Sequence, residues 1–148
     1  MADEPNTRKN GVLFLCTGNA CRSQMAEGFA KSIAPDDVLV FSAGTFPAHL
    51  SSRAVKVMQE IGIDISNQYS KRIDDIPVSE IGTVITLCDS AERMCPSFPA
   101  KRKLHWPIPD PVGTMGDEER VLREFRKVRD MIMEKVENYF KYEEWKDE

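Results

Sequence analysis

The sequence has no long apolar run and no excess of positive charge. None of its apolar stretches approaches the roughly 18 residues that a membrane-spanning helix needs, and residues 1–10 contain no apolar segment of the kind found in secretory signals. Lys and Arg number 20 against 24 Asp and Glu, which gives a net charge of -4. We therefore expect a cytoplasmic protein that neither crosses a membrane nor binds nucleic acid.

Cysteine is also scarce, with 4 residues in a chain of 148, namely Cys16, Cys21, Cys88 and Cys95. Cytoplasmic thiols stay reduced unless they bind metal, react or take part in redox chemistry, so their spacing is a guide to function. Structural zinc sites favour ligand pairs separated by about two to four residues. Cys88 and Cys95 enclose six, and Cys16 has a better explanation, so zinc is disfavoured.

The length, together with 41% hydrophobic residues, predicts a single domain over residues 11–148, preceded by a flexible lead at residues 1–10. Short apolar runs alternate with helical patterns along it. This alternation predicts an α/β fold, an open parallel sheet of about four strands that is flanked by helices and covered on both faces, with ligands beyond the carboxyl ends of the strands. The predicted strands are 12–15, 38–41, 83–87 and 103–106, and the predicted helices are 23–33, 51–61 and roughly the last 30 residues.

The loop between the first predicted strand and helix is the strongest chemical signal. Cys16 and Arg22 are separated by five residues, so the loop can curl around an oxyanion. Backbone N–H groups, the helix N-terminus and the Arg22 guanidinium would bind the anion, and Gly18 permits a left-handed backbone. The same field favours the Cys16 thiolate, so a nucleophile and an anion site coincide. The residues expected around the anion are Thr17, Gly18, Asn19, Ala20, Cys21, Arg22 and Ser23.

Two residues near this loop have both a structural and a chemical interpretation. Ser23 can donate a hydrogen bond to the Cys16 sulfur, although helix capping alone is the simpler interpretation. Asp110 precedes Pro111 in the loop after the fourth predicted strand, where a carboxylic acid can protonate a leaving oxygen. Turn formation explains the same Asp-Pro pair and is favoured by the sequence alone.

Cys88 ends the third predicted strand, and Cys95 follows after a polar, helix-compatible stretch. A helix over this span would separate the two Cα atoms by roughly 10 Å, beyond the about 7 Å that a disulfide tolerates. The resting pair is therefore predicted to be reduced, and its oxidation would unwind the segment and expose it to a reductant. The alternative is that these cysteines are buried structural thiols. The sequence favours this interpretation for Cys21, and for Cys88 it favours neither a structural nor a redox role.

Taken together, these residues give the chain a resemblance to the thioredoxin-coupled arsenate reductases. Their fold is that of the low-molecular-weight protein tyrosine phosphatases, phosphotyrosine phosphatase I-like. The resemblance extends from about Gly11 to the C-terminal helix. The matching stretches are Cys16 to Gly28 (CTGNACRSQMAEG), Ser42-Ala43-Gly44, Gly62 to Asn67 (GIDISN), Thr86 to Cys88, Cys95-Pro96, His105-Trp106 and Asp110-Pro111.

The resemblance implies a three-thiol relay in arsenic detoxification. Cys16 would attack arsenate held by the loop amides and Arg22, and Asp110 would assist loss of the first oxygen. Cys88 would then attack Cys16, so that arsenite leaves as a Cys16–Cys88 disulfide forms. Cys95 would attack Cys88, and thioredoxin would reduce the resulting Cys88–Cys95 disulfide. The implied protein is a monomer without a bound cofactor, whose partners are thioredoxin and arsenate, with phosphate or sulfate as competing anions.

Some relatives of this kind bind potassium beside the loop through Asn, Glu, Ser and Asp side chains. Asn19, Glu27 and Ser42 match three of these positions, whereas Lys71 occupies the Asp position. We therefore expect no metal, and we expect the Lys71 ammonium to replace the cation electrostatically. Ala20 stands where a serine is frequent, a change that a loop binding through its backbone tolerates.

Two other functions compete with arsenate reduction. A low-molecular-weight tyrosine phosphatase would use Cys16, Arg22 and Asp110 to hydrolyse phosphate esters through a phosphocysteine. It would not require the second cysteine pair, and Val112-Gly113 stands where such phosphatases place aromatic residues. A non-enzymatic oxyanion-binding protein would keep the loop and bind without turnover. Arsenate reduction is favoured because every group of the relay is present.

Overall fold

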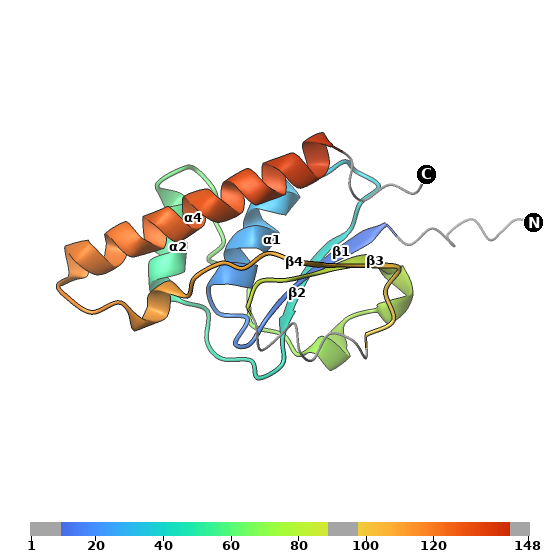
Figure 1. Ribbon diagram of the computed structural model, residues 1–148, viewed down its shortest axis with the longest axis horizontal. Coiled ribbons are helices and arrows are strands. Elements are labelled where there is room, and N and C mark those ends of the chain that lie inside the picture. The colour runs from blue at the N-terminus through green and yellow to red at the C-terminus, as the bar shows by residue number, and fades with distance from the viewer. Residues whose placement is uncertain (1–9, 89–97, 143–148) are drawn as a thin grey trace, which may run out of the picture.

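A computed structural model describes residues 10–88 and 98–142 of the chain. Four strands form one parallel sheet in the order β2-β1-β3-β4 (Figure 1). Most of the predicted lead and Cys95 lie outside the described residues. The strands are β1 (Gly11–Cys16), β2 (Val40–Gly44), β3 (Ile81–Thr86) and β4 (Arg102–His105), and the helices are α1 (Arg22–Ile33), α2 (Ser52–Gln59) and α4 (Glu118–Lys141). Short 3₁₀ helices occupy Ile73–Asp75, Val78–Glu80 and Pro111–Gly113.

The predicted strands all form, with bounds that shift by one to three residues. The largest correction concerns the second strand, which was predicted over 38–41. Val38 instead closes a turn by donating its N–H to Pro35 O, and pairing with β1 starts at Val40. The strand then runs on to Gly44, because Gly44 pairs with Cys16 at the end of β1.

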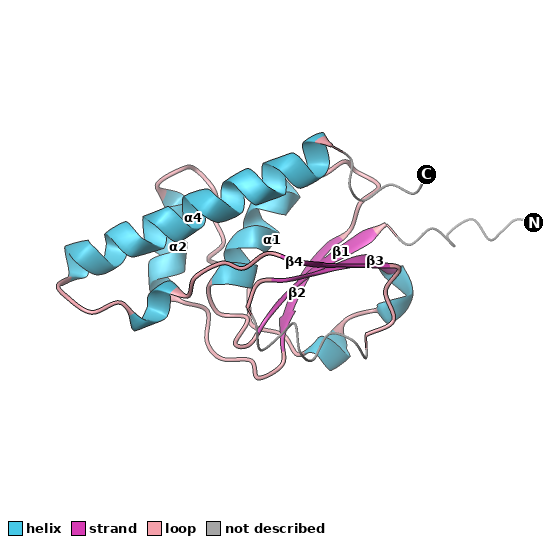
Figure 2. Ribbon diagram, in the orientation of Figure 1, coloured by secondary structure: helices cyan, strands magenta, loops and turns pink. Residues whose placement is uncertain are grey.

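The two faces of the sheet are covered differently. Successive residues of β1 point to opposite faces, so Val12 and Phe14 pack in the core formed with α1, α2 and α4. Leu13 and Leu15 belong to a second, smaller core that includes Ile76 and Phe98. Both faces are covered, as predicted, but in the described part of the chain α1, α2 and α4 lie on the same side (Figure 2).

Helix α4 buries the predicted apolar stripe against this sheet and α1. Its N-cap is Asp117, whose side chain accepts a hydrogen bond from Arg120 N at 2.9 Å, and the acidic first turn stabilises the helix dipole. The buried stripe consists of Val121, Phe125, Val128, Ile132, Val136 and Tyr139. Within residues 10–88 and 98–142, no helix combines the length and apolarity that crossing a membrane requires.

The predicted reactive residues gather at one edge of the sheet. Cys16 is the last residue of β1, Cys88 comes two residues after β3 ends, and Asp110 follows β4. The carboxyl ends of parallel strands meet at the same edge, where open α/β sheets bind their ligands. The fold therefore brings these three residues to one site.

Candidate active site

The loop from Cys16 to Arg22 is held from outside by the chain segment that follows β2. The carbonyl oxygens of Thr17, Gly18 and Ala20 accept hydrogen bonds of 2.8 Å from backbone N–H groups of this segment, those of Phe46, Ala48 and Ser51. In a trans peptide the carbonyl and the N–H point in opposite directions. The N–H groups of these peptides are therefore directed to the inside of the loop, as an anion site requires.

A pocket of about 390 Å³ lies over this loop. Its size accommodates a tetrahedral oxyanion, and its lining combines a thiol, a guanidinium and a carboxylate. It is lined by Cys16, Thr17, Gly18, Ala20, Cys21, Arg22, Asp110 and Val112. Of the residues predicted to surround the anion, Asn19 and Ser23 are absent from this lining and lie beneath the loop.

The left-handed residue of the loop is Asn19, with φ 49°, and the freedom that Gly18 offers for this conformation is not used. Asparagine tolerates this conformation because its short polar side chain finds local hydrogen bonds. Asn19 Nδ2 donates to Ser23 Oγ at 2.8 Å and to Ser42 Oγ at 2.9 Å, and Asn19 Oδ1 accepts from Lys71 N at 2.8 Å. The side chain thus ties the loop to α1, β2 and residue 71.

Gly44 is required where this network meets the loop. A Cβ at residue 44 would lie 2.6 Å from Thr17 O and 3.0 Å from Asn19 N. These contacts are with backbone atoms that cannot move without distorting the loop. Glycine at the end of β2 therefore allows the sheet to support the loop from below.

Cys16 is 3% exposed, and its sulfur lies 2.9 Å from Ser23 Oγ. Because Ser23 Oγ accepts a hydrogen bond from Asn19, the Ser23 proton is available to the sulfur. Ser23 is the second residue of α1, whose N-cap is Cys21 without a side-chain cap. The simpler interpretation, that Ser23 only caps the helix, is therefore wrong, because Ser23 contacts Cys16.

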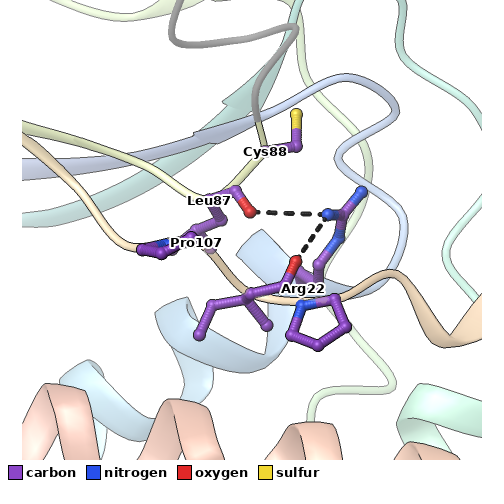
Figure 3. A pocket seen from close by; sticks show the side chains of 6 residues that line it. Arg22, Leu87, Cys88 and Pro107 are labelled. Carbon is purple, nitrogen blue, oxygen red and sulfur yellow. Dashed lines mark hydrogen bonds between the residues drawn. The ribbon is translucent and has the colours of Figure 1, made fainter.

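Arg22 points toward the ends of the other strands. Its Nη1 donates to Ile108 O at 3.0 Å and to Leu87 O at 3.4 Å (Figure 3), and its Nη2 lies 3.5 Å from Asp110 Oδ2. The other carboxylate oxygen of Asp110 accepts a hydrogen bond from Val112 N at 3.0 Å. Asp110 therefore forms the predicted turn and also faces the anion pocket beside Arg22.

Cys88 contacts the same loop. Its sulfur lies 3.3 Å from Thr17 Oγ1, and with Arg22 and Pro107 it lines a second pocket of about 330 Å³ (Figure 3). The site thus brings a second thiol to the loop that bears Cys16. Cys95 lies outside the described residues, so the prediction for the span between Cys88 and Cys95 stays a prediction.

Cys21 and Cys16 both belong to the loop and are equally buried, at 4% and 3% exposure. The Cys16 sulfur contacts Ser23 Oγ, whereas Cys21 packs in the core with α1 and α4. Burial raises the pKa of its thiol, and the charges of Asp110 and Cys16 raise it further. A protonated thiol is a poor nucleophile, in agreement with the structural role favoured for Cys21.

The residues predicted to surround a cation lie together beneath the loop. Ser42 Oγ donates to Glu27 Oε1, and Lys71 Nζ lies 3.5 Å from the same oxygen. Residues 10–88 and 98–142 contain no group of three His, Cys, Asp or Glu that could hold a metal ion. These residues do not fit a bound cation, because an ammonium group already neutralises the carboxylate that would bind it.

Sequence reasoning missed two residues that brace the loop. Gln24 Nε2 donates to Asn19 O at 2.9 Å, and Ser70 Oγ donates to the same oxygen at 2.7 Å. Gln24 lies on the buried side of α1 and is 0% exposed. A polar residue on an apolar helix face is the signal that would have identified it.

Comparison with known proteins agrees with this geometry. Residues 11–148 match the family described as low molecular weight phosphotyrosine protein phosphatase. An arsenate reductase of Staphylococcus aureus (strain Newman) is 44% identical over 132 residues, which are 88% of this chain and 96% of that protein. Among solved structures, an arsenate reductase in the oxidized state is 35% identical with a TM-score of 0.76, covering 87% of this chain and 95% of the other. An arsenate reductase in the phosphate binding state is 35% identical with a TM-score of 0.72, covering 86% and 94%.

Proposed function

The chain belongs to the low molecular weight phosphotyrosine protein phosphatase family and is 44% identical to an arsenate reductase over 88% of its length, and we propose that it reduces arsenate by a relay in which Cys16, Cys88 and Cys95 act in sequence. The observation that carries this proposal is the hydrogen-bond contact of 3.3 Å between Cys88 Sγ and Thr17 Oγ1 on the anion loop. Hydrolysis of a phosphate ester needs no second thiol there. The relatives named arsenate reductase support the same choice.

The first step is attack of the Cys16 thiolate on arsenate bound by the loop N–H groups and Arg22. Ser23 Oγ, at 2.9 Å, stabilises the thiolate by donating to its sulfur. A sulfur–arsenic bond forms and an arsenate oxygen leaves as water. Asp110, which faces the same pocket, is the proton donor for this oxygen.

The second step transfers two electrons to arsenic. The Cys88 thiolate attacks the Cys16 sulfur, a sulfur–sulfur bond forms, and the electron pair of the sulfur–arsenic bond moves to arsenic. Arsenic(V) becomes arsenic(III), arsenite leaves, and the two thiols become a disulfide. Cys88 contacts Thr17, the residue that follows Cys16 in the chain, which supports this step.

The third step regenerates Cys16. Cys95 attacks Cys88, and the Cys88–Cys95 disulfide is reduced by thioredoxin, which supplies the two electrons consumed in each cycle. Cytoplasmic location, where such reductants operate, agrees with the reduced thiols required at the start of the cycle. Phosphate and sulfate, which resemble arsenate in charge and shape, compete for the loop.

The test is arsenite production from arsenate with thioredoxin, thioredoxin reductase and NADPH. Cys88→Ser should release no arsenite above background, because arsenic(V) cannot gain its two electrons. Cys95→Ser should release one arsenite per enzyme molecule and then stop, because the first disulfide can form but cannot be passed on. Undiminished multiple turnover by Cys95→Ser would contradict the relay.

The family match makes phosphate-ester hydrolysis the second candidate. It requires Cys16, Arg22 and Asp110 only, so hydrolysis of an aryl phosphate should be retained in both serine variants. If the wild-type protein hydrolyses the aryl phosphate rapidly and forms no arsenite, it is a phosphatase. If it binds arsenate in equilibrium dialysis and turns over neither compound, it is a binding protein.

A further inference from the structure

A carboxylate is buried beneath the anion loop although it takes no part in the steps above. Glu27 is 3% exposed, and it lies on α1 one turn after Ser23. Burying an unpaired charge is strongly unfavourable. A negative charge close to the loop would also oppose both the Cys16 thiolate and a bound oxyanion. The fold must therefore neutralise Glu27.

Two lysines do so, and they use different oxygens of the carboxylate. Lys31 Nζ pairs with Oε2 and its side chain is 53% exposed. Lys71 Nζ lies 3.5 Å from Oε1 and its side chain is only 13% exposed. Oε1 is also the oxygen that accepts the hydrogen bond of Ser42. Lys71 therefore neutralises the carboxylate oxygen that is connected to the anion loop.

Glu27 Oε1 is connected to the nucleophile by hydrogen bonds with a fixed direction. Since Ser42 donates to Glu27, its oxygen is free to accept from Asn19 Nδ2, at 2.9 Å. The other Nδ2 proton of Asn19 goes to Ser23 Oγ at 2.8 Å. The Ser23 proton is thereby directed to Cys16 Sγ at 2.9 Å. A carboxylate at one end thus orients a donor toward a thiolate at the other.

Lys71 is itself held in place at several points. Its backbone N–H donates to Asn19 Oδ1 at 2.8 Å, and its carbonyl accepts from Gly44 N at 2.8 Å. Its ammonium group donates to Tyr69 O at 2.7 Å and lies 4.7 Å from the centre of the Tyr69 ring. Burial lowers the pKa of Lys71, whereas the charge of Glu27 opposes that shift and favours the ammonium form.

We propose that Lys71 is a positioning residue for Cys16, and that its ammonium group performs, inside the fold, the neutralising role that a bound monovalent cation would perform at Glu27. The proposal depends on one part of the proposed function, that Cys16 is the anion-site nucleophile. It predicts that the protein needs no potassium, and that removal of the Lys71 charge creates a need for a cation.

The test measures alkylation of Cys16 by iodoacetamide, followed by mass spectrometry of the peptide that contains Cys16. This reagent is neutral, so the positive loop does not attract it, and the reaction does not require arsenate turnover. Each protein is measured in choline chloride and in potassium chloride at equal ionic strength, with and without inorganic phosphate. Lys71→Met removes the charge and keeps a long side chain, Lys31→Met is the matched control on the other oxygen, and Lys71→Arg restores the charge.

In choline chloride, Cys16 of Lys71→Met should be alkylated about tenfold more slowly than Cys16 of the wild type. This effect lies within the range of coupling energies between residues of one hydrogen-bond network. Phosphate should protect Cys16 less in Lys71→Met than in the wild type, and potassium should restore part of the alkylation rate of this variant. The wild-type rate should not respond to potassium. The rates of Lys31→Met and Lys71→Arg should remain within about threefold of the wild-type rate. In a Glu27→Gln background, Lys71→Met should have no further effect, because no charge remains to be neutralised.

Equal rates for Lys71→Met and Lys31→Met would overturn the proposal, as would acceleration of the wild type by potassium over choline. Thermal unfolding of each variant shows whether it is folded. If Lys71→Met is unfolded, the comparison of Glu27→Gln with the double variant Glu27→Gln and Lys71→Met takes its place. Failure of the wild type to reduce arsenate, with these alkylation results intact, would contradict the proposed reaction and leave the role of Lys71 standing.

Discussion

The two sides of the anion loop differ in burial and in how firmly they are held. We define the floor as Asn19, Ser23, Ser42 and Glu27, the side chains beneath the loop, which are 0 to 3% exposed and joined by hydrogen bonds. We define the rim as Cys88, Asp110 and Val112, the side chains around the opening of the pockets. The Asp110 side chain is 52% exposed, and one hydrogen bond and one ion pair of 3.5 Å hold its carboxylate.

This difference matches what the proposed reaction requires of each side. A buried polar network with satisfied partners has one favoured arrangement, so the floor fixes the loop and the nucleophile before substrate arrives. In the proposed reaction the rim groups change position or protonation, because Cys88 leaves Thr17 for Cys16 and Asp110 gives up a proton. Firm contacts would slow both events.

The first prediction tests whether the rim acts on the chemical step. Asp110→Asn keeps a side-chain oxygen that can accept from Val112 N, so the turn should persist, but an amide cannot supply the proton. We expect kcat for arsenite production to fall about a hundredfold, the lower end for loss of a general acid. Phosphate protection of Cys16 from alkylation should change little. A large loss of phosphate binding with unchanged kcat would make Asp110 a binding residue.

The rim and the loop were the parts of the site that the sequence could predict. Cys16, Cys88 and Asp110 each lie just after the end of a predicted strand, and the carboxyl ends of parallel strands must share an edge. Local spacing also predicted α4, because its apolar stripe has the period of a helix. Wherever the signal lies within one segment, sequence reasoning identified the element, and the bounds of the strands, α1 and α2 were correct to within three residues. The C-terminal helix was predicted over roughly the last 30 residues, whereas α4 ends at Lys141.

The floor depended on contacts between segments that are far apart in the chain. That Asn19 rather than Gly18 is left-handed follows from partners on β2 and at residue 71, which no local pattern reveals. Ser23 has a good local explanation as a cap. Asn19, which directs the Ser23 proton to Cys16, is only four residues away, but its side chain is oriented by Ser42 and the Lys71 N–H from distant segments. Resemblance grouped Asn19, Glu27, Ser42 and Lys71 and predicted that the Lys71 ammonium replaces a cation, but its distance of 3.5 Å from Glu27 Oε1 required the structure.

The second prediction concerns Asn19, which is hydrogen-bonded to two other residues of the floor, Ser23 and Ser42. Asn19→Ala leaves Ser23, Ser42 and the Lys71 N–H without their partner and places alanine in a left-handed backbone. We expect the free energy of unfolding to fall by about 2 kcal/mol, from the unsatisfied buried groups and the backbone cost together. Val112→Ala is the matched rim variant, and it should remain within about 0.5 kcal/mol of wild type. Urea denaturation measures both, and equal losses would show that floor and rim do not differ.

The third prediction concerns Cys21, which belongs to the loop but is as buried as the floor. Its pKa is raised in the folded protein, chiefly by burial, so the native state keeps the proton after the unfolded chain has lost it. A group of this kind contributes stability that is fully present below the unfolded pKa, about 8.5 for a thiol, and is lost as pH rises above it. Between pH 7.5 and 9.5, wild type should lose about 1 kcal/mol more of its unfolding free energy than Cys21→Ala, in which no thiol ionises.

Urea denaturation at each pH, with a reductant present throughout, measures this difference. The alanine variant is expected to be less stable at every pH, because it removes a buried sulfur, so the slope against pH decides the outcome and the offset does not. Parallel curves would mean that Cys21 ionises as readily in the folded protein as in the unfolded chain. The raised pKa of Cys21 could then not explain why Cys16, rather than Cys21, is the nucleophile in the proposed reaction.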